Sequence, residues 1–330
     1  MKGFLCRFII IIAAVFLFIF LGEVYLKYFS YYGVDSLQNF GDELLSRDPE
    51  IIWENPYAME TLEPYFYDKN SAQESDKYRI LVIGDSIACG GKLKKGDIAF
   101  PAIVEELLNK KYGKDKFKVL TYASGGYSTK QEVRFYETKG KLLKPDLLIL
   151  AYCYNDTAEL SPRITKNKGR YILRYYRTDI PYLNKLPFNR YFTEKLLLSR
   201  LMNEALIKLS KKYNLPISLD YCFLPHEKIH AYFRRLAEVT KNSGTSVAIA
   251  VFPPLSESLT PDKRRMHRSI KKWCREFNFL NIDLLEEYRQ YNSLKLRADS
   301  NDNCHPNQLG HKIAAEYIVE KLKKNYLRTK

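Results

Sequence analysis

The sequence predicts an α/β fold in which a mostly parallel sheet carries helices on both faces. Short apolar runs such as residues 80–83 and 146–152 lack polar alternation, which is typical of strands buried on both faces of a parallel sheet. Helix-like segments separate these runs along most of the chain. Small or polar residues follow the runs, as at Gly84-Asp85-Ser86, so that the chain leaves the sheet abruptly.

The expected elements alternate along the chain in the order that such a sheet requires. Pro101 suits the first turn of one helix, and Pro253-Pro254 closes one strand. The strands are expected at residues 80–83, 117–123, 146–152, 246–252 and 280–285, and the helices at 99–112, 130–142, 226–241, 261–277 and from the segment after Pro306 to about 326.

Two segments differ in composition from this pattern. Residues 27–78 are rich in Tyr, Asp, Glu and Asn, and their prolines are expected to break any helix, so they are interpreted as a juxtamembrane stalk that docks through residues 51–53. Residues 157–225 carry many basic residues among tyrosines, with a helix-like stretch at 192–213. They are interpreted as an insertion over the carboxyl edge of the sheet, which either binds glycan or anionic lipid or forms a solvated lid.

The amino-terminal segment is apolar without interruption from residue 8 to residue 22. About 20 residues become available for a membrane span if Arg7 and Glu23 reach the two interfaces. The sequence therefore predicts a single-pass transmembrane signal anchor at residues 8–26; a cleaved signal peptide is the alternative, although no small-x-small cleavage pattern follows. Because Lys2 and Arg7 precede the span, residues 1–7 are expected in the cytoplasm and the rest on the extracytoplasmic side.

Length and composition narrow the class of protein. The 330 residues suffice for one core of about 200 to 250 residues plus appendages, and 46% hydrophobic residues exclude disorder. The net charge of +15 is not accompanied by a zinc-finger or RNA-recognition signature, so no nucleic-acid partner is expected. A basic face beside an anionic membrane or glycan explains the charge as well. The oligomeric state cannot be read from the chain.

Three residues at the expected carboxyl edge of the sheet have the side chains of a nucleophilic site. A serine hydroxyl such as that of Ser86 is a weak nucleophile until a base takes its proton. His305 is the natural base, and Asp302 would hold its other ring nitrogen and favour the imidazolium. Taken singly, Ser86 could merely cap a helix and His305 could lie on a helix surface.

Donors for a developing oxyanion are expected in the neighbouring loops. The backbone amides of Ser86 and Gly126 and the side-chain amide of Asn155 would supply three donors. Together with the serine, histidine and aspartate, they predict acyl transfer.

In these motifs the sequence resembles the SGNH hydrolases, also called GDSL esterases and lipases. The resemblance covers about residues 79–326 and rests on four pieces: Gly84-Asp85-Ser86, Ala123-Ser124-Gly125-Gly126-Tyr127-Ser128, Asn155-Asp156, and Asp302-x-x-His305-Pro306-Asn307-x-x-Gly310-His311. It implies a flavodoxin-like three-layer sandwich with a mostly parallel five-stranded sheet. It also implies Ser86, Asp302 and His305 as catalytic residues, with Ser86, Gly126 and Asn155 as the oxyanion hole.

The sequence departs from that family beside the expected oxyanion donor. Cys153 and Tyr154 occupy places before Asn155 where the family often has glycine, and a tyrosine ring there would narrow the pocket against a large lipid. The five cysteines after residue 26 are scattered and odd in number, so no disulfide framework is expected. Cys153 and Cys304 each neighbour a candidate site residue, and both a bridge between them and two independent thiols stay open.

No metal or other cofactor is expected. Residues 226–230 match the His-Glu-x-x-His pattern of zinc proteases, but Pro225 places the first histidine at a helix start and basic residues flank the motif. An exposed helix start is the simpler interpretation.

The function expected from the sequence is that of a membrane-anchored serine ester hydrolase. The expected partner is an acylated small molecule or glycan, from which the enzyme would remove a short acyl group, such as acetyl, through an acyl-enzyme. An O-acyltransferase on envelope polysaccharide, a lysophospholipase or thioesterase, and a glycan-binding scaffold without turnover are the alternatives.

Overall fold

The computed structural model divides the chain into two compact units, one of Met1–Asp42 with Glu159–Cys222 and the other of Glu43–Ala158 with Phe223–Lys330. The residues that the structure describes are 2–25, 39–40, 46, 48, 50–51, 54–67, 77–157, 161–167, 170–176, 226–256, 259–300 and 302–326.

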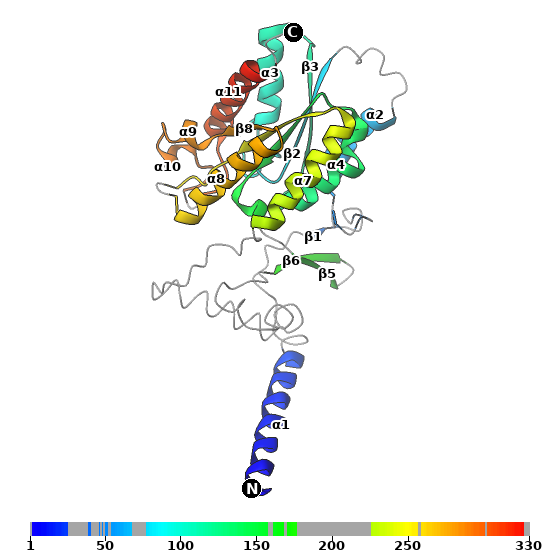
Figure 1. Ribbon diagram of the computed structural model, residues 1–330, viewed down its shortest axis with the longest axis vertical. Helices are drawn as coiled ribbons and strands as arrows, with labels where there is room; N and C mark the ends of the chain where they lie inside the picture. Colours follow the sequence, from blue (N-terminus) through cyan, green and yellow to red (C-terminus); the bar gives the residue numbers. More distant parts are fainter. Residues whose placement is uncertain are drawn as a thin grey trace. The chain divides into compact units, whose positions relative to one another are not determined.

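The second unit contains a five-stranded sheet in the order β3-β2-β4-β7-β8, and all of its strand pairs are parallel. Of these five strands, β2 comes first in the chain and lies between β3 and β4, which is the flavodoxin-like order. This confirms the α/β sandwich expected from the sequence (Figure 1). The strands are β2 (Tyr78–Gly84), β3 (Phe117–Ala123), β4 (Leu147–Tyr152), β7 (Ser246–Val251) and β8 (Leu280–Asp283).

Helices cover both faces of this sheet. On one face α3 (Phe100–Tyr112) lies beside α11 (Gln308–Asn325), and on the other α4 (Thr129–Thr138) lies beside α7 (His226–Ser243), as Figure 1 shows. The helix α8 (Pro261–Glu276) packs against β8 and α7. Each face thus has its own apolar layer, as a doubly wound sheet requires.

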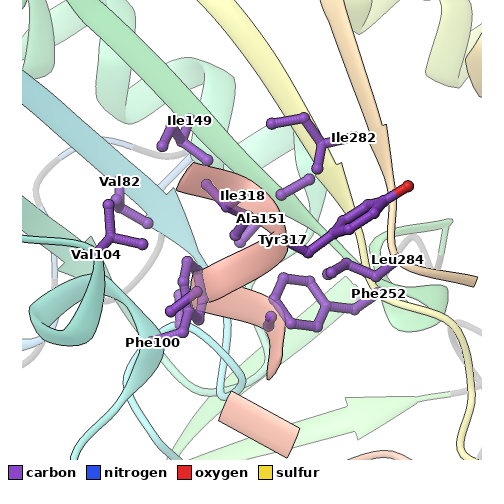
Figure 2. Packing of buried hydrophobic residues seen from close by; sticks show 14 of the residues in the cluster. Val82, Phe100, Val104, Ile149, Ala151, Phe252, Ile282, Leu284, Tyr317 and Ile318 are labelled. Atoms are coloured by element: carbon purple, nitrogen blue, oxygen red, sulfur yellow. The ribbon is translucent and has the colours of Figure 1, made fainter. Parts of the chain in front are cut away.

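The layer between the sheet and the pair α3 and α11 holds much of the core. Alternate residues of β2 and β4, such as Val82 and Ile149, point toward Phe100 and Val104 of α3 and Ile318 of α11 (Figure 2). All five side chains are fully buried. Because burying one such side chain contributes roughly 1.5–3 kcal/mol, this layer fixes the last helix firmly against the sheet.

The register of the three central strands aligns their carboxyl ends. Gly84, the last residue of β2, pairs with Ala123 of β3 and with Ala151 of β4. The loops that begin at Asp85, at Ser124 and just after Tyr152 therefore leave the sheet at one edge.

The segment between residues 54 and 67 contains a helix that the sequence analysis did not expect. The helix α2 spans Pro56–Tyr67 and includes Pro64. Pro56 is tolerated because it is the first helical residue, where its missing N–H would have no partner in any case. Asn55 caps the helix, since its Oδ1 accepts from the Tyr57 amide at 3.1 Å, and its Nδ2 donates to the Ala123 carbonyl at 2.8 Å.

Several element ends also differ from the expectation. The helix expected at 130–142 is divided into α4 and the short 3-10 helix η4 (Gly140–Leu143). The strand expected at 280–285 stops at Asp283, whose carboxylate accepts the Leu285 amide at 3.0 Å in a turn that leads into α9 (Leu285–Tyr288). Two further short helices are η5 (Tyr154–Thr157) and α10 (Ser293–Leu296).

The first unit contains α1 (Lys2–Tyr25) and a three-stranded antiparallel sheet in the order β1-β6-β5. Its strands are β1 (Asn39–Phe40), β5 (Ser161–Asn167) and β6 (Arg170–Tyr176). The sequence analysis assigned no strand to these segments, because their charged and aromatic residues do not form a continuous apolar run. The helix-like stretch at 192–213 lies outside the described residues.

A transmembrane anchor at residues 8–26 was expected from the sequence. Of the helices that the structure describes, none has both the length and the apolar character that crossing a membrane requires.

Candidate active site

Ser86 lies at the carboxyl edge of the sheet, two residues after the end of β2. The turn is closed by Asp85, whose Oδ1 accepts from the Ile87 amide at 2.9 Å. A side chain on Gly84 would place its Cβ 2.7 Å from the Cβ of Ala88 and 2.9 Å from the Cβ of Ala151. Only glycine therefore lets the chain leave the sheet closely enough to bring the serine to this position.

His305 joins Ser86 and Asp302 in a chain of two hydrogen bonds. Its Nε2 lies 2.9 Å from Ser86 Oγ, and its Nδ1 lies 2.7 Å from Asp302 Oδ2. Since the carboxylate can only accept when ionised, Nδ1 carries the proton and Nε2 is the acceptor for the serine hydroxyl. The structure thus brings together the three residues that the sequence singled out as nucleophile, base and partner.

The backbone around His305 holds the imidazole in place. The His305 carbonyl accepts from the Ala298 amide at 3.0 Å. Asn307 caps α11, since its side chain accepts from the Gly310 amide at 3.1 Å. The imidazole is thereby carried at the start of a helix whose apolar face is buried against the sheet.

Asp302 is largely buried and surrounded by hydrogen-bond donors. Burial by itself raises the pKa of Asp302, but bonds from Lys92, from the amides of Cys304 and His305 and from the His305 ring together hold the pKa of Asp302 below its usual range. The Lys92 Nζ lies 2.6 Å from Asp302 Oδ2. Asp302 is therefore a carboxylate throughout the neutral range.

Two of the three expected oxyanion donors can be placed. The amides of Ser86 and Gly126 donate to no other group in the described part of the chain. Gly126 has a φ of +79°, which favours glycine, and an added Cβ on Gly125 would lie 4.0 Å from the Cβ of Ser86. The backbone of Asn155 lies in η5, but its side chain falls outside what the structure describes.

Beneath the serine lies a group of acidic residues that the sequence analysis did not identify as a cluster. Asp85, Glu132 and Asp156 are all fully buried. Burial, and next the charge of Asp85, raises the pKa of Glu132 well above its usual value; burial, and next the charge of Glu132, does the same for the pKa of Asp156. In the sequence, Glu132 resembles any surface residue of a polar helix, so only the packing of α4 identifies it.

Asp85, Cys153 and Asp156 also have the donor atoms of a metal site, within 4.8 Å of one another. Burial raises the pKa of the Cys153 thiol, which stays protonated and lies 3.0 Å from Asp85 Oδ2, its acceptor. The Cys153 amide donates to Asp156 Oδ2 at 2.6 Å. Cys153 is thereby linked to Asp85 through its thiol and to Asp156 through its backbone amide.

The structure also bears on the disulfide considered between Cys153 and Cys304 and on the His-Glu-x-x-His segment at residues 226–230. Cys153 and Cys304 are not joined by a disulfide in the structure. In the His-Glu-x-x-His segment, His230 Nε2 lies 2.9 Å from Glu276 Oε1, and its ring packs against Trp273 and Phe277. His230 is thus engaged between two helices.

The comparison with protein families matches the model described as GDSL-like lipase/acylhydrolase over residues 80–318. The chain belongs to this family. The matched range includes every residue of the candidate site, and it confirms the resemblance drawn from the four motifs. The GDSL-like lipase/acylhydrolase described here is accordingly a carboxylic ester hydrolase.

Three solved structures illustrate what this GDSL-like hydrolase is similar to. Axe2, an acetylxylan esterase from Geobacillus stearothermophilus, is 18% identical, with 77% of this chain and 97% of that chain covered and a TM-score of 0.47. The acetyl xylan esterase AlAXEase is 14% identical, with 73% and 98% covered and a TM-score of 0.46. LAE5, an alpha/beta hydrolase enzyme from the metagenome of Lake Arreo, Spain, is 13% identical, with 74% and 94% covered and a TM-score of 0.47. The comparison with curated proteins gave no match.

The raised pKa of the buried Glu132 carboxyl predicts how the free energy of unfolding depends on pH. Because its pKa is raised above the usual value of 4.5 in the folded protein, the folded state binds this proton more tightly than the unfolded state. The free energy of unfolding therefore falls as the pH rises above about 4.5 toward the folded pKa. Glu132→Gln removes this loss, and we expect the variant to be more stable than the wild type at pH 7, with a smaller loss of stability between pH 5 and pH 7.

Urea unfolding of the two proteins at pH 5 and pH 7 measures this difference. Glu106→Gln, on the exposed side of α3, is the matched control and should reproduce the pH dependence of the wild type. Equal pH dependence in the wild type and Glu132→Gln would contradict the prediction.

Proposed function

We propose that this hydrolase cleaves acyl esters through an acyl-enzyme formed on Ser86. The observation that carries the proposal is the pair of hydrogen bonds at 2.9 and 2.7 Å that links Ser86 to His305 and His305 to Asp302. As Ser86 Oγ attacks the carbonyl carbon, its proton passes to His305 Nε2. The carboxylate of Asp302 stabilises the imidazolium that results.

The tetrahedral oxyanion of this step requires donors that are already oriented. The amides of Ser86 and Gly126 are proposed for this role, together with the side chain of Asn155. Support comes from the register that ends β2, β3 and β4 at one edge, so that these three loops border the serine. Collapse of the intermediate expels the alcohol, which takes the proton from His305.

Water then hydrolyses the acyl-enzyme by the same two steps, attack and collapse, with water as the nucleophile and Ser86 as the leaving group. It loses a proton to His305 as its oxygen attacks the acyl-enzyme carbonyl, and collapse of the second intermediate breaks the bond to Ser86 Oγ. The serine regains its proton, and the carboxylic acid leaves. No redox change or cofactor takes part in this sequence of steps.

We propose a short acyl group, such as acetyl, carried by a carbohydrate or another component of the cell envelope. The close approach of the backbone around the nucleophile supports a small acyl group. An added Cβ on Gly91 would lie 2.9 Å from the Ser86 carbonyl oxygen and 3.4 Å from Cδ2 of His305. Tyr154, next to Asn155, is nearly buried, and Lys263 Nζ lies 4.8 Å from its ring centroid.

We propose, from the sequence alone, that the hydrolase is held at a membrane with its catalytic domain on the extracytoplasmic side. The support is the apolar run at residues 8–22 preceded by Lys2 and Arg7.

The first prediction from the proposed function concerns the nucleophile. A fluorophosphonate probe should label the wild type at Ser86, and Ser86→Ala should abolish the label. Asp302→Asn should keep the fold and lose about 1,000-fold or more in kcat, because His305 would then be held in the wrong tautomer. Intact-protein mass spectrometry and steady-state kinetics measure the two effects. Folded wild-type protein without an adduct would refute the enzyme mechanism and favour a binding scaffold.

The second prediction concerns acyl-chain length. If the space near Gly91 and Tyr154 admits only a small acyl group, kcat/KM for nitrophenyl acetate should exceed that for nitrophenyl decanoate by at least about tenfold. Tyr154→Ala should narrow the difference, whereas Tyr57→Ala, on the exposed surface of α2, should not. A preference of the wild type for the decanoate would contradict the short-acyl proposal.

The third prediction concerns location. Full-length protein should remain with the membrane fraction after carbonate washing, and protease added to the outer side of intact spheroplasts should digest the catalytic domain. Full protection of the domain, with digestion only after lysis, would place it in the cytoplasm instead.

A further inference from the structure

We propose that Lys92 is a positioning residue that keeps His305 unprotonated, and hence competent as a base, at lower pH than the Asp302–His305 pair would allow alone. This inference rests on the proposed function of the site. It concerns a residue outside the four motifs that carry the family resemblance.

The first observation is that Lys92 and His305 bind the same atom. The Lys92 Nζ lies 2.6 Å and the His305 Nδ1 lies 2.7 Å from Asp302 Oδ2. The other oxygen, Oδ1, already accepts from the amides of Cys304 at 2.8 Å and His305 at 3.1 Å. The negative charge that would otherwise attract a proton onto the imidazole is therefore shared with a permanent cation.

The second observation is the backbone that presents this lysine. Lys92 has a φ of +65°, a region that residues other than glycine seldom adopt. It follows Gly90, at a φ of +77°, and Gly91, whose amide donates to the Ser86 carbonyl at 2.6 Å. A left-handed backbone at a non-glycine residue is costly and is concentrated at functional sites. Here the turn that contains Lys92 is hydrogen-bonded to the backbone of Ser86, and the Lys92 side chain forms an ion pair with Asp302.

The consequence for the base follows from the charges. In the resting state, Asp302 stabilises a protonated imidazole, and a protonated His305 cannot accept the serine proton. The Lys92 cation opposes that protonation, since like charges next to each other disfavour the charged form. Because the lysine side chain is 55% exposed, water screens its effect, and a moderate shift is expected rather than one of several pH units.

The other charged groups around the pair act differently. The hydrogen bond to Asp302, and further the charges of Asp302 and Asp299, raise the pKa of Lys92 and keep it a cation. Arg297 is held by the carbonyls of Leu255 at 2.8 Å and Ser300 at 2.9 Å. Among the described residues, His311 on α11 also interacts with His305 and has a shifted pKa. Burial, and next the charge of His305, lowers the pKa of His311 to about 4, so that its ring is neutral at the pH of the assay.

The test compares kcat/KM across pH 4.5 to 9 for phenyl acetate, by acetate release, in the wild type and Lys92→Met. We expect the acidic limb of the Lys92→Met profile to lie about 0.5 to 1 pH unit higher, with the plateau at high pH changed by less than about threefold. At pH 5.5 the variant should therefore lose about three- to tenfold in kcat/KM. Lys92→Arg should restore the wild-type limb, because it restores the cation.

Lys95→Met is the matched control, since Lys95 is exposed in the same loop and its profile should coincide with that of the wild type. An unchanged acidic limb in Lys92→Met would overturn the proposal. So would a lower plateau with an unchanged limb, because Lys92 would then only hold Asp302 in place. Fluorophosphonate labelling of each variant counts the folded sites, and Lys92→Gln repeats the test with a polar side chain. If Ser86→Ala hydrolysed phenyl acetate as fast as the wild type, the proposed function itself would fail, which is a separate outcome.

Discussion

The parallel register of β2, β3 and β4 is the constraint on which the rest of the site depends. Because Gly84 pairs with both Ala123 and Ala151, three loops begin at the same height on one edge of the sheet. A slip of one residue in either pairing would turn a whole strand over and move its loop away from the serine. Residues of β2 and β4 are buried on both faces of the sheet, so a slip would disrupt the close packing of two apolar layers at once.

The candidate base, His305, is positioned at this edge by helix packing and not by strand pairing. His305 stands at the start of α11, and α11 is fixed by apolar packing against α3 and the sheet. The hydrogen bond from Ser86 to His305 thus joins two parts of the molecule that are positioned independently, one by strand pairing and one by helix packing. Below them, Asp85, Glu132 and Asp156 are fully buried, and burial raises the pKa of both Glu132 and Asp156.

Much of this arrangement could be predicted from the sequence, and the reasons for the rest are physical. The strand at residues 117–123 and the other core strands follow from apolar runs, and the site residues follow from the motifs after those runs. The helix α2 was missed because prolines at its first position and in its interior looked like breaks. Lys92 carries no local signal at all: its partner, Asp302, is distant in the chain, and the contact depends on a left-handed turn that a lysine seldom adopts.

The 219 positions that separate Ser86 from His305 have a consequence for the newly made protein. The nucleophile is synthesised early, whereas the imidazole belongs to the final segment of the sheet unit and is oriented only once α11 has packed. A polypeptide that ends before α11 lacks the packing that places the imidazole of His305 2.9 Å from Ser86 Oγ. The candidate site is therefore assembled only once the tertiary structure of the sheet unit is complete.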